Sequence, residues 1–574
     1  MTSFDIERLP FAQEALLDWA SLDRRYTNWP VVYTLHGSNK VYVGETLNAA
    51  SRLRQHLDSP EKSKLEAIRV VIDDSFNKSV CLDLESHLIR LFSGDGQFEV
   101  INRNAGITDA DYFGRTEYQK HFREVFEELR EQGLFSRSIP EIENSDLFKL
   151  SPFKALTNDQ AVAVEQILEG LFEDIDLGLN STSVIQGNPG TGKTVVGIFL
   201  LKMLRDIATY NFDEPVDDDS LFSDFFTPGF VELVQDLRVG MVVPQQSLRE
   251  SVQRVFKKTP GLNSIQVLTP FYVGESAEQF DLLVVDEAHR LNQRANQSSA
   301  AQNKKFQDIN IRLFGADDDA YTQLDWVKAQ SRHQILLLDT EQAVRPADLP
   351  LNTTNALIQS AKDENRWYPL VSQMRVRASE DYVGYVRRVL GGNEESNKYF
   401  SDYDLRMFDD LNDLYRELRA QESEHGLCRL VAGYAWPWVS KKNPDSSDIK
   451  LDGLEFKWNT VAKDWVNSMN AFNEVGSIHT VQGYDLNYAG VIIGPDLKFD
   501  PEAHRLYVDR SNYFDTKGKE NNPRLGHEYS DDDLLTFVVN IYSVLLTRGI
   551  RGTFVYCCDL ELRKYLAEFF PSGS

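Results

Sequence analysis

Gly187-Asn188-Pro189-Gly190-Thr191-Gly192-Lys193-Thr194 is the stretch of sequence that decides the fold. It fits the pattern GxxxxGKS/T, follows the apolar run at residues 183–185, and opens a segment with helical spacing. A strand, a glycine-rich turn and a helix in this order let backbone N–H groups surround phosphates, while Lys193 adds a positive charge. The Thr194 hydroxyl can ligate magnesium. The stretch predicts a nucleotide-binding loop, and a glycine-rich turn without a ligand is the alternative.

Two acidic residues complete this expected site. Asp286 and Glu287 follow the apolar residues 282–285, so they lie at the carboxyl end of an expected strand. A carboxylate there can hold magnesium, which suits Asp286, and Glu287 can polarise the water that attacks the terminal phosphate. A solvated acidic turn is the alternative. Paired with the loop, the two carboxylates predict ATP hydrolysis with Mg²⁺.

Short apolar runs recur along the chain from residue 156 onward, each followed by a turn and an amphipathic segment. They lie at residues 183–185, 240–243, 282–285, 335–338, 491–493 and 553–556. Such runs are typical of parallel strands that helices cover on both faces. The sequence therefore predicts an α/β fold class with two parallel sheets in this part of the chain.

The remaining motifs indicate the kind of nucleotide-binding protein. Their order resembles the superfamily 1 helicases, and more closely the Schlafen-type bacterial helicase modules of that group. The resemblance covers about residues 156–559, and its motifs lie at 156–160, 243–246, 339–342, 373–375, 478–485 and 545–549. Two positions depart from the pattern: Leu338 replaces the glycine of GDxxQ, and Asp485 stands where Glu is usual. The resemblance implies two RecA-like parallel-sheet domains that form a helicase core.

The resemblance also assigns roles to single residues. It implies that Gln160 reads adenine, that Gln342 and Asp485 join the nucleotide-binding set, and that Arg375 and Arg548 are arginine fingers. We expect the loop and the acidic pair on one sheet and both arginines on the other. ATP then closes the cleft, because the arginines pair with phosphate only when the lobes approach. Alternatively, Arg375 is a surface arginine and Gln160 a helix-face amide.

The first ~110 residues predict a separate small mixed α/β unit. Residues 31–35 and 40–44 alternate like strands, and residues 36–39 between them have turn chemistry, which predicts a hairpin. The hairpin resembles that of the GIY-YIG nucleases, with Val31 in place of the leading glycine. Arg52, His56, Glu85 and Asn102 follow in the order of that family. The resemblance covers roughly residues 29–106.

This resemblance implies phosphodiester hydrolysis at one divalent cation, Mg²⁺ or Mn²⁺. Glu85 would hold the cation. The other implied roles are base or water orientation for Tyr33, a hydrogen bond beside it for Tyr42, transition-state stabilisation for Arg52, phosphate binding for His56 and bracing for Asn102, with Asn104 a rival brace. The two tyrosines could instead be a cross-strand packing pair. A DNA-binding but inactive domain is the second alternative.

The sequence predicts four segments. These are a nuclease-like domain at 1–110, a helical linker at 111–150, a first RecA-like domain at 151–345 and a second at 346–574. Two acidic stretches read as surface insertions, near 207–238 and 501–535, the second ending in Asp531, Asp532 and Asp533. The insertions carry no recognisable motif, so solvated loops are the expectation for both.

Bulk composition limits the remaining choices. The 574 residues are 42% hydrophobic and 11% aromatic, as in a globular protein. No run of about 20 apolar residues predicts a membrane span, and the start lacks a secretory signal pattern. Four cysteines without CxxC pairing favour a reducing cytoplasm. The net charge of −27 argues against a protein that coats DNA, but a narrow translocation channel needs no basic exterior.

Together these patterns predict an ATP-driven nucleic-acid translocase that delivers a metal-dependent endonuclease. DNA is favoured over RNA because both modules act mostly on DNA in their families, and foreign DNA is the expected target by the same analogy. One alternative is a helicase whose front domain binds branched DNA or RNA without cutting. Others are an NTP-sensing switch that does not translocate and a scaffold with a vestigial ATPase. The sequence does not determine the oligomeric state.

Overall fold

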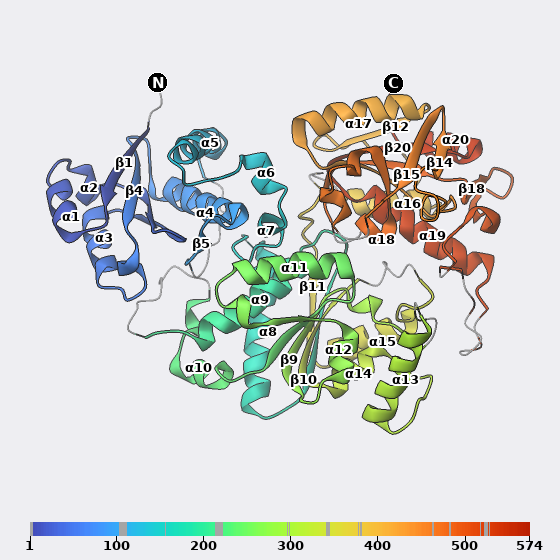
Figure 1. Cartoon of the computed structure of the whole chain (residues 1–574), viewed down its shortest axis with the longest axis horizontal. Helices are drawn as coiled ribbons and strands as arrows, with labels where there is room; N and C mark the ends of the chain where they lie inside the picture. Colours follow the sequence, from blue (N-terminus) through green and yellow to red (C-terminus); the bar gives the residue numbers. More distant parts are fainter. Residues whose placement is uncertain are drawn as a thin grey trace. The chain divides into compact units, whose positions relative to one another are not determined.

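The computed structural model describes residues 4–573, apart from 103–111, 155, 213–221, 295–296, 298, 340–344, 377, 379–380, 462–463, 482–483, 517, 520, 522–525 and 527. The described chain falls into two compact units (Figure 1). The first holds Met1–Leu179, Thr194–Val239 and Ser251–Gln266, and the second holds Asn180–Lys193, Gly240–Glu250 and Val267–Ser574. In the part that is described, no helix is long and apolar enough to cross a bilayer.

A five-stranded sheet forms the start of the first unit. Its order is β1-β4-β2-β3-β5, with bounds Phe4–Pro10, Ala67–Asp73, Val31–His36, Lys40–Thr46 and Glu99–Val100. β2 and β3 form the expected antiparallel hairpin, in which Tyr33 lies opposite Gly44. Alternate residues of β2 enter different cores: Val31, Tyr33 and Leu35 lie in one, and Val32 in the other. The sheet is therefore buried on both faces.

Four helices accompany this sheet, and two of them begin at side-chain caps. Their bounds are α1 Gln13–Ala20, α2 Arg25–Asn28, α3 Ala49–Leu57 and α4 Lys78–Asp95. The side chain of Asn48 accepts a hydrogen bond from Ser51 N, and that of Asn77 accepts one from Val80 N. Asx side chains satisfy otherwise unpaired N–H groups of a first turn. These caps fix where α3 and α4 begin, and both helices carry residues of the candidate nuclease site.

The segment expected as a helical linker is helical, and it packs in the N-terminal core. It contains α5 Arg115–Glu131, α6 Ile139–Glu143 and α7 Asp146–Lys149. A Cβ on Gly94 of α4 would lie 2.7 Å from Ile142 Cγ2 and 2.8 Å from Phe148 Cβ, so only glycine permits this approach. Phe122 and Phe126 of α5 are buried in the same core. The helices are thus a layer of the first unit rather than a free connection.

The second unit holds the sheet that carries the nucleotide-binding loop. Its order is β11-β6-β10-β9-β7-β8, with bounds Trp367–Leu370, Ser181–Gly187, Ser331–Leu338, Phe280–Val285, Val239–Val242 and Gln266–Leu268. The pairings of β11 with β6, β6 with β10, and β10 with β9 are parallel, as expected. The helices between residues 158 and 363 are α8 Asn158–Asp176, α9 Lys193–Ala208, α10 Pro228–Val234, α11 Gln246–Lys258, α12 Pro270–Glu275, α13 Ala300–Phe314, α14 Gln323–Ala329 and α15 Leu351–Asp363. Of these, α8, α10 and all of α9 after Lys193 belong to the first unit, and α11 is divided between the two units.

The strand β11 corrects one boundary and one residue placement. The sequence ends the first lobe at residue 345 and assigns Arg375 to the second sheet. However, β11 pairs with β6 beside the nucleotide-binding loop, so the first sheet continues to Leu370 and Arg375 follows one of its strands. The strand is four residues long and contains Pro369. Proline lacks an N–H donor and is tolerated at a sheet edge, and such a short strand has little periodicity to detect.

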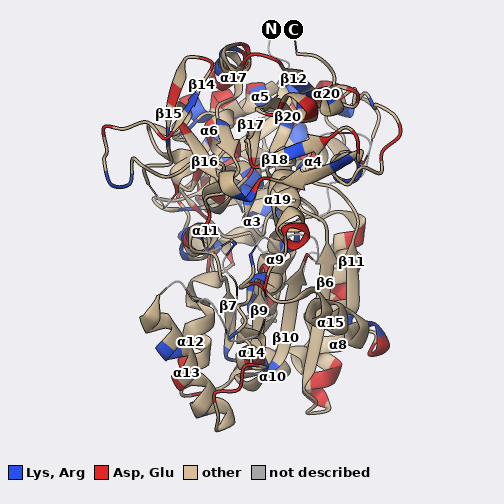
Figure 2. Ribbon diagram, turned by 90° about the vertical axis from the view of Figure 1, so that its right-hand side faces the viewer, with Lys and Arg blue, Asp and Glu red and all other residues tan. Residues whose placement is uncertain are grey.

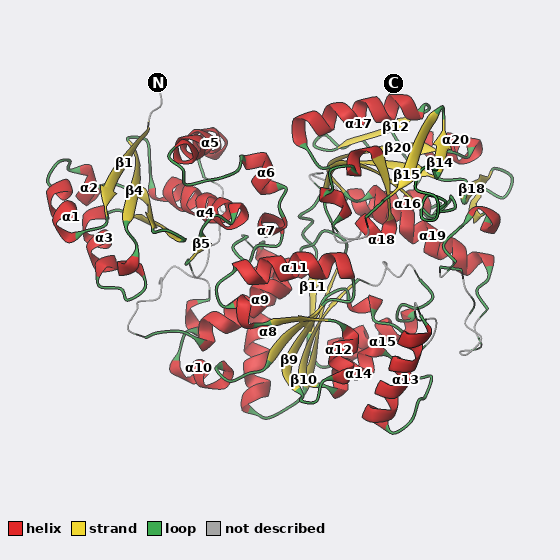
Figure 3. Ribbon diagram, viewed as in Figure 1, coloured by secondary structure: helices red, strands yellow, loops and turns green. Residues whose placement is uncertain are grey.

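A second parallel sheet follows in the same unit (Figure 3). Its order is β12-β20-β17-β13-β16-β15-β14, with bounds Asp404–Phe408, Gly549–Cys557, Leu486–Ile493, Cys428–Ala432, Glu474–Ser477, Leu454–Trp458 and Ile449–Leu451. Only β14 with β15 is antiparallel among these pairings. The associated helices are α16 Tyr382–Leu390, α17 Leu411–His425, α18 Ile478–Val481, α19 Asp531–Leu546 and α20 Leu560–Ala567. Residues of β17 alternate between two cores, which confirms the two-sided burial.

The stretch expected as an insertion near 501–535 is partly regular structure. β18 Leu497–Asp500 and β19 Arg505–Val508 form an antiparallel hairpin. The three acidic residues 531–533 form the first turn of α19, where Ser530 and Asp533 make a capping box. Carboxylates are stabilised at a helix N-terminus, so this acidity has a structural use. Figure 2 shows Asp and Glu on many elements. In the other acidic stretch, near 207–238, residues 213–221 lie outside the described residues, and α10 follows them.

A buried carboxyl group lies just after β17. Asp496 is fully buried, Tyr542 OH donates to its Oδ1 at 2.6 Å, and no residue in the described part of the chain forms a hydrogen bond with its Oδ2. Burial raises the pKa of Asp496 to about 7, while the hydrogen bond from Tyr542 opposes this rise. A folded-state pKa above the unfolded value means that stability is greatest at low pH and falls as pH rises from about 4 to 7.

Replacing Asp496 with asparagine should remove this pH-dependent cost. We expect Asp496→Asn to stabilise the protein at about pH 8 by up to about 4 kcal/mol, with the gain vanishing near about pH 4. Urea unfolding at both pH values measures the difference. Asp532→Asn, at an exposed position, is the matched control and should not show this pH dependence. An equal effect of Asp496→Asn at both pH values would contradict the argument.

Candidate functional sites

The nucleotide-binding loop has the backbone that its glycines permit. Gly190 and Gly192 have φ values of 86° and 79°, where a β-carbon is strained. Lys193 begins α9, and its Nζ donates to Gly187 O at 2.6 Å and to Asn188 O at 3.1 Å. Asp339 Oδ2 lies 3.5 Å from the same nitrogen. The lysine is therefore held over the loop, where a phosphate can replace these oxygen partners.

The acidic pair lies at the end of β9, as expected. Asp286 is buried, and its Oδ1 accepts a hydrogen bond from Glu287 N at 3.0 Å. Glu287 has a left-handed backbone with φ 48°, and its Oε2 lies 3.0 Å from His289 Nε2. Burial by itself would raise the pKa of Glu287, but His289, Arg290 and Lys193 together lower it. Glu287 thus stays ionised, and Asp286 presents the hard oxygen ligand that Mg²⁺ prefers.

His289 connects the acidic pair to the next motif, a link that the sequence does not predict. Its Nδ1 accepts a hydrogen bond from Asp339 N at 3.3 Å. Asp339 follows β10, so one imidazole joins the ends of β9 and β10 through Glu287 and Asp339. The signal was present in the sequence, because His289 completes the letters DEAH, but spacing alone does not identify its partner. Gln342, in the same motif as Asp339, lies outside the described residues.

The two expected arginine fingers lie close to each other and to the acidic pair. Arg375 forms an ion pair with Asp485, and Arg548 is 2% exposed. Burial and the charge of Arg375 together lower the pKa of Arg548 to about 9, while Asp485 and Glu287 oppose this shift. Arg375 Nη1 and Arg548 Nε are buried without a hydrogen-bond partner in the described chain. Two neighbouring guanidinium groups, each with one such nitrogen, suit a phosphate, which accepts several donors.

A third arginine approaches the loop without belonging to any motif. Arg387 of α16 donates from Nη1 to Asn188 Oδ1 at 3.3 Å. Burial lowers the pKa of Arg387, and the negative charge of Asp339 opposes that shift. Within α16 the residue reads as an ordinary basic residue of a last turn, so no sequence pattern distinguishes it. Only the tertiary structure brings it to the nucleotide-binding loop.

Two further expected nucleotide ligands occupy helix starts. Gln160 is the third residue of α8, where its Oε1 accepts a hydrogen bond from Thr157 N at 3.1 Å in a capping box. Its buried position gives it a structural task whether or not it reads adenine. Thr194 is the second residue of α9. The adenine-reading and magnesium-binding roles of these two residues remain predictions.

The N-terminal cluster is built around Tyr33. This side chain is fully buried, and its hydroxyl lies 2.8 Å from His56 Nε2. A Cβ on Gly44, directly opposite in the hairpin, would lie 2.4 Å from the Tyr33 hydroxyl oxygen. The glycine therefore makes room for the phenol. The Tyr42 ring centroid lies 5.2 Å from that of His56, so the two tyrosines share one imidazole neighbour.

Charges around Tyr33 identify its other neighbours. Burial raises the pKa of Tyr33 well above its ordinary value; Tyr42 and Glu85 raise it further, and Arg52 lowers it. Burial, aided by Lys62 and Arg52, lowers the pKa of His56 to about 3. His56 is therefore neutral near pH 7. A neutral imidazole at hydrogen-bond distance from Tyr33 can exchange a proton with it, which differs from the expected role of His56 as a phosphate ligand.

Asn102 braces the hairpin from the end of β5. Its Oδ1 accepts a hydrogen bond from Val43 N at 3.0 Å, and its Nδ2 donates to Val43 O at 2.7 Å. Both polar groups of one residue of β3 are thus satisfied by a single side chain, next to the Gly44 that faces Tyr33. The rival brace, Asn104, lies outside the described residues. Asn102 thus braces β3, and its role in a nuclease site remains a prediction.

The metal expected at this site has one candidate protein ligand. Glu85 of α4 is half-buried and close enough to affect the pKa of Tyr33. Among the described residues no group of three or more His, Cys, Asp and Glu side chains could form a metal cluster. A single carboxylate fits Mg²⁺, which keeps several water ligands and takes others from phosphates. Glu45, which the sequence did not single out, is nearby and pairs with Lys78.

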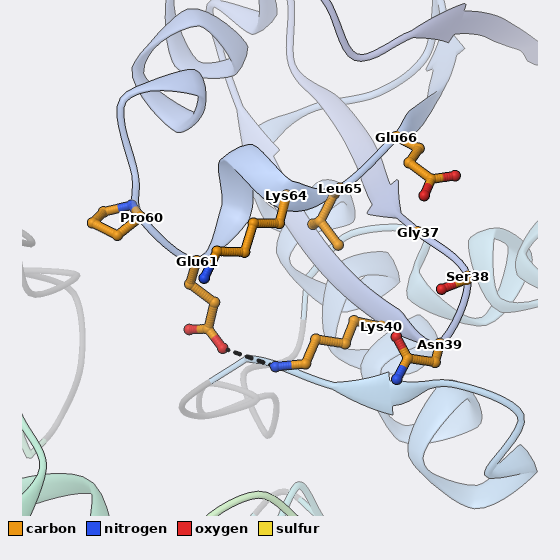
Figure 4. A pocket seen from close by; sticks show the side chains of 9 residues that line it. All are labelled: Gly37, Ser38, Asn39, Lys40, Pro60, Glu61, Lys64, Leu65 and Glu66. Carbon is orange, nitrogen blue, oxygen red and sulfur yellow. Dashed lines mark hydrogen bonds and ion pairs between the residues drawn. The ribbon is translucent and has the colours of Figure 1, made fainter.

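A separate cavity of about 440 Å³ adjoins the hairpin turn (Figure 4). It lies between residues 37–40 and residues 60–66. Lys40 and Lys64 line it together with Glu61 and Glu66, and Lys40 Nζ lies 3.4 Å from Glu61 Oε1. The opposed charges cancel, and none of the expected nuclease residues lines the cavity. It is therefore a feature distinct from the Tyr33 cluster.

Two parallel sheets, a nucleotide-binding loop, an acidic strand end and paired arginines define the class of the second unit: a P-loop motor of the helicase type. Residues 180–559 match the family described as Schlafen group 3, DNA/RNA helicase domain. The chain belongs to this family. Residues 1–179, which include the Tyr33 cluster, lie outside the match.

Individual relatives are more distant. The uncharacterized protein YPL245W of Saccharomyces cerevisiae is 24% identical over 419 residues, which cover 67% of this chain and 83% of that protein. Two solved structures of Pif1 helicases, one of two helicases at forked double-stranded DNA and one from Bacteroides with ADP-AlF3 and single-stranded DNA, are 9% and 10% identical. Each covers 70% of this chain and 92% of its own, with a TM-score of 0.26.

Proposed function

We propose that this helicase-family chain is an ATP-driven translocase on nucleic acid, preferentially DNA, that delivers an endonuclease carried by residues 1–110. The observation that supports the nuclease half best is the buried Tyr33–His56 pair at 2.8 Å, seated over Gly44 with Arg52 and Glu85 close by. A packing pair of tyrosines would need none of these polar neighbours. Their convergence therefore favours chemistry over packing.

In the motor, each residue has a task that its geometry permits. Lys193 exchanges its carbonyl and Asp339 partners for the phosphates of ATP. Glu287, ionised and oriented by His289, accepts a proton from the attacking water. Mg²⁺, which Thr194 and Asp286 would hold, supplies charge neutralisation on the phosphates. The repulsion between Arg375 and Arg548 is relieved by the γ-phosphate and returns after hydrolysis, which provides a drive for domain motion.

In the nuclease, the water that attacks the phosphodiester is oriented by Tyr33. His56 is neutral, so its Nε2 can take the phenolic proton when Tyr33 receives one from that water. Arg52 stabilises the additional negative charge of the transition state. Mg²⁺ or Mn²⁺, which Glu85 would hold, supplies polarisation of the scissile phosphate and charge neutralisation on the leaving oxygen. Asn102 keeps the hairpin in register by binding both polar groups of Val43.

The proposal is tested by measuring cleavage and strand displacement on forked and plasmid DNA, with Mg²⁺ or Mn²⁺ and with or without ATP. We expect cleavage that ATP accelerates, together with ATP-dependent strand displacement. ATP hydrolysis and cleavage without any displacement would instead support an NTP-sensing switch. Robust ATP hydrolysis with no cleavage of DNA or RNA under any condition would make the front domain a binding module. The same assays with RNA substrates test the preference for DNA.

The biological setting that we propose is defence against foreign DNA, by analogy with the combination of the two modules. A host that depends on this chain for resistance to a phage or plasmid should lose that resistance when the ATPase is inactivated. Equal plating of the phage on hosts with the active and the inactive chain would remove the defence role. It would leave the biochemical proposal intact.

A further inference from the structure

The connection between β13 and β14 combines aromatic and basic side chains. It spans residues 433–448, here called the aromatic loop, and contains Tyr434, Trp436 and Trp438 followed by Lys441 and Lys442. The three aromatic side chains are half-buried, and both lysines are exposed. Exposed lysines beside half-buried aromatic rings suit a ligand that is both anionic and planar.

The aromatic loop lies at the carboxyl edge of the second parallel sheet. It follows β13, which pairs in parallel with both β16 and β17. A Cβ on Gly494, which follows β17, would lie 2.2 Å from Ala435 Cβ and 3.1 Å from Trp436 Cη2. The connections after two central strands therefore pack together at this edge. Ligands of open α/β sheets bind outside the carboxyl ends of the strands, so the loop is in the position where a ligand is expected.

Specific hydrogen bonds hold the aromatic loop in shape. Asp448 is buried and accepts hydrogen bonds from Ser440 N at 2.7 Å, from Ser440 Oγ at 2.5 Å and from Trp458 N at 2.8 Å. Lys457 Nζ donates to Pro444 O at 2.5 Å. These bonds tie the far end of the loop to β15. A preorganised loop loses little conformational entropy when a ligand binds, which favours a binding surface over a mobile connection.

The aromatic side chains form a platform on one buried tryptophan. The ring centroids of Tyr434, Trp436 and Trp438 lie 5.6, 6.3 and 6.4 Å from that of Trp458, which is fully buried. Trp458 belongs to the core against which Trp436 and Trp438 pack, while these two half-buried side chains keep part of their surface toward solvent. Lys441 Nζ lies 5.4 Å from the Trp438 ring centroid, so the charge is placed beside the aromatic surface.

We propose that the aromatic loop is a contact site for single-stranded nucleic acid, in which Trp438 stacks on a base and Lys441 and Lys442 bind backbone phosphates. Every base presents a π-face, so such a contact tolerates any sequence, as a translocating motor requires. Lysines that neutralise phosphates release counterions and make binding dependent on salt. The inference rests on the proposed function, because it places a strand of nucleic acid at this edge of the motor.

The test is equilibrium binding of fluorescent oligo(dT) and oligo(U), each of about 20 nucleotides, to the full chain without nucleotide. We expect Trp438→Leu to weaken binding about 10-fold. Lys441→Glu with Lys442→Glu should also weaken it about 10-fold at low salt and reduce the slope of log affinity against log salt by about 2. Whichever polymer the wild type binds more tightly should show these losses. Lys304→Glu with Lys305→Glu, an adjacent exposed pair on α13, makes the same charge change and should have a much smaller effect.

An abasic oligonucleotide separates stacking from charge. With this probe Trp438→Leu should have no effect, whereas the lysine variant should still weaken binding. If the wild type binds neither polymer, the proposed function itself fails. If the wild type binds and both loop variants bind equally well, only the aromatic loop is excluded. If Trp438→Leu unfolds the chain, the double substitution of Lys441 and Lys442 still tests the proposal, because these exposed positions do not contribute to the core.

Discussion

Replacing Lys193 with alanine should lower the rate of ATP hydrolysis by about 100- to 1000-fold, the usual effect of removing one charge-stabilising group from a preorganised site. The Nζ of Lys193 is held by Gly187 O, Asn188 O and Asp339 above the loop that receives the phosphates. The kcat for ATP, measured as phosphate release with and without single-stranded DNA, gives the result.

Stability must be separated from chemistry in this experiment, because the alanine also removes the ion pair with Asp339. Lys328→Ala is a matched control, since Lys328 is exposed and precedes β10 at the amino edge of the same sheet. Both variants should unfold within a few degrees of the wild type, and only Lys193→Ala should lose hydrolysis. A Lys193→Ala chain that keeps more than about a tenth of the wild-type rate would show that the loop does not carry the catalytic charge.

Replacing Glu85 with glutamine should lower DNA cleavage at least about 100-fold while leaving ATP hydrolysis at the wild-type rate. The glutamine keeps the size of the side chain but removes the charge that we propose holds the divalent cation. Nicking of supercoiled plasmid, followed with time in Mg²⁺ and in Mn²⁺, measures the loss.

The control for this variant is Glu124→Gln, an exposed position on α5 of the same unit, which should cut like the wild type. Nicking that survives Glu85→Gln would remove Glu85 from the site and, with it, the nuclease assignment as we state it. Loss of cleavage together with loss of ATP hydrolysis would indicate that the change acts on the whole chain rather than on one site. Only the separated loss supports two distinct active sites.

Much of the motor could be predicted because its determinants are local. The loop at 187–194 needs glycines at two positive φ angles and a lysine at the start of a helix, and a short sequence pattern states all of these requirements. The acidic pair needs only an apolar run before it. The hairpin at Val31–Thr46 is equally local, because strand alternation and a polar turn determine the pairing of Tyr33 with Gly44. Each of these features depends only on residues of one strand and of the element that follows it in the chain.

The limits appear where a contact joins segments that are distant in sequence. Nothing in the letters of α16 indicates that Arg387 reaches Asn188, or that His289 receives the N–H of Asp339. The strand β11 was not predicted, because four residues that include one proline show no periodic pattern of apolar residues. As a result, the sequence analysis assigned Arg375 to the wrong sheet. The sequence likewise does not show which polar side chains are buried. The neutral state of His56 and its hydrogen-bond distance from Tyr33 are therefore known only from the structure.

By itself, the sequence determined that this protein contains an α/β motor with a phosphate-binding loop and an acidic strand end, because backbone conformation and strand burial are written in local patterns. It also determined which polar residues were candidates at the amino-terminal hairpin. Only the tertiary structure decided which of these side chains meet, which are desolvated and which are left without partners. Those properties depend on how strands and helices that are distant in sequence pack together. This packing sets both the distances between the polar side chains and the dielectric constant around them.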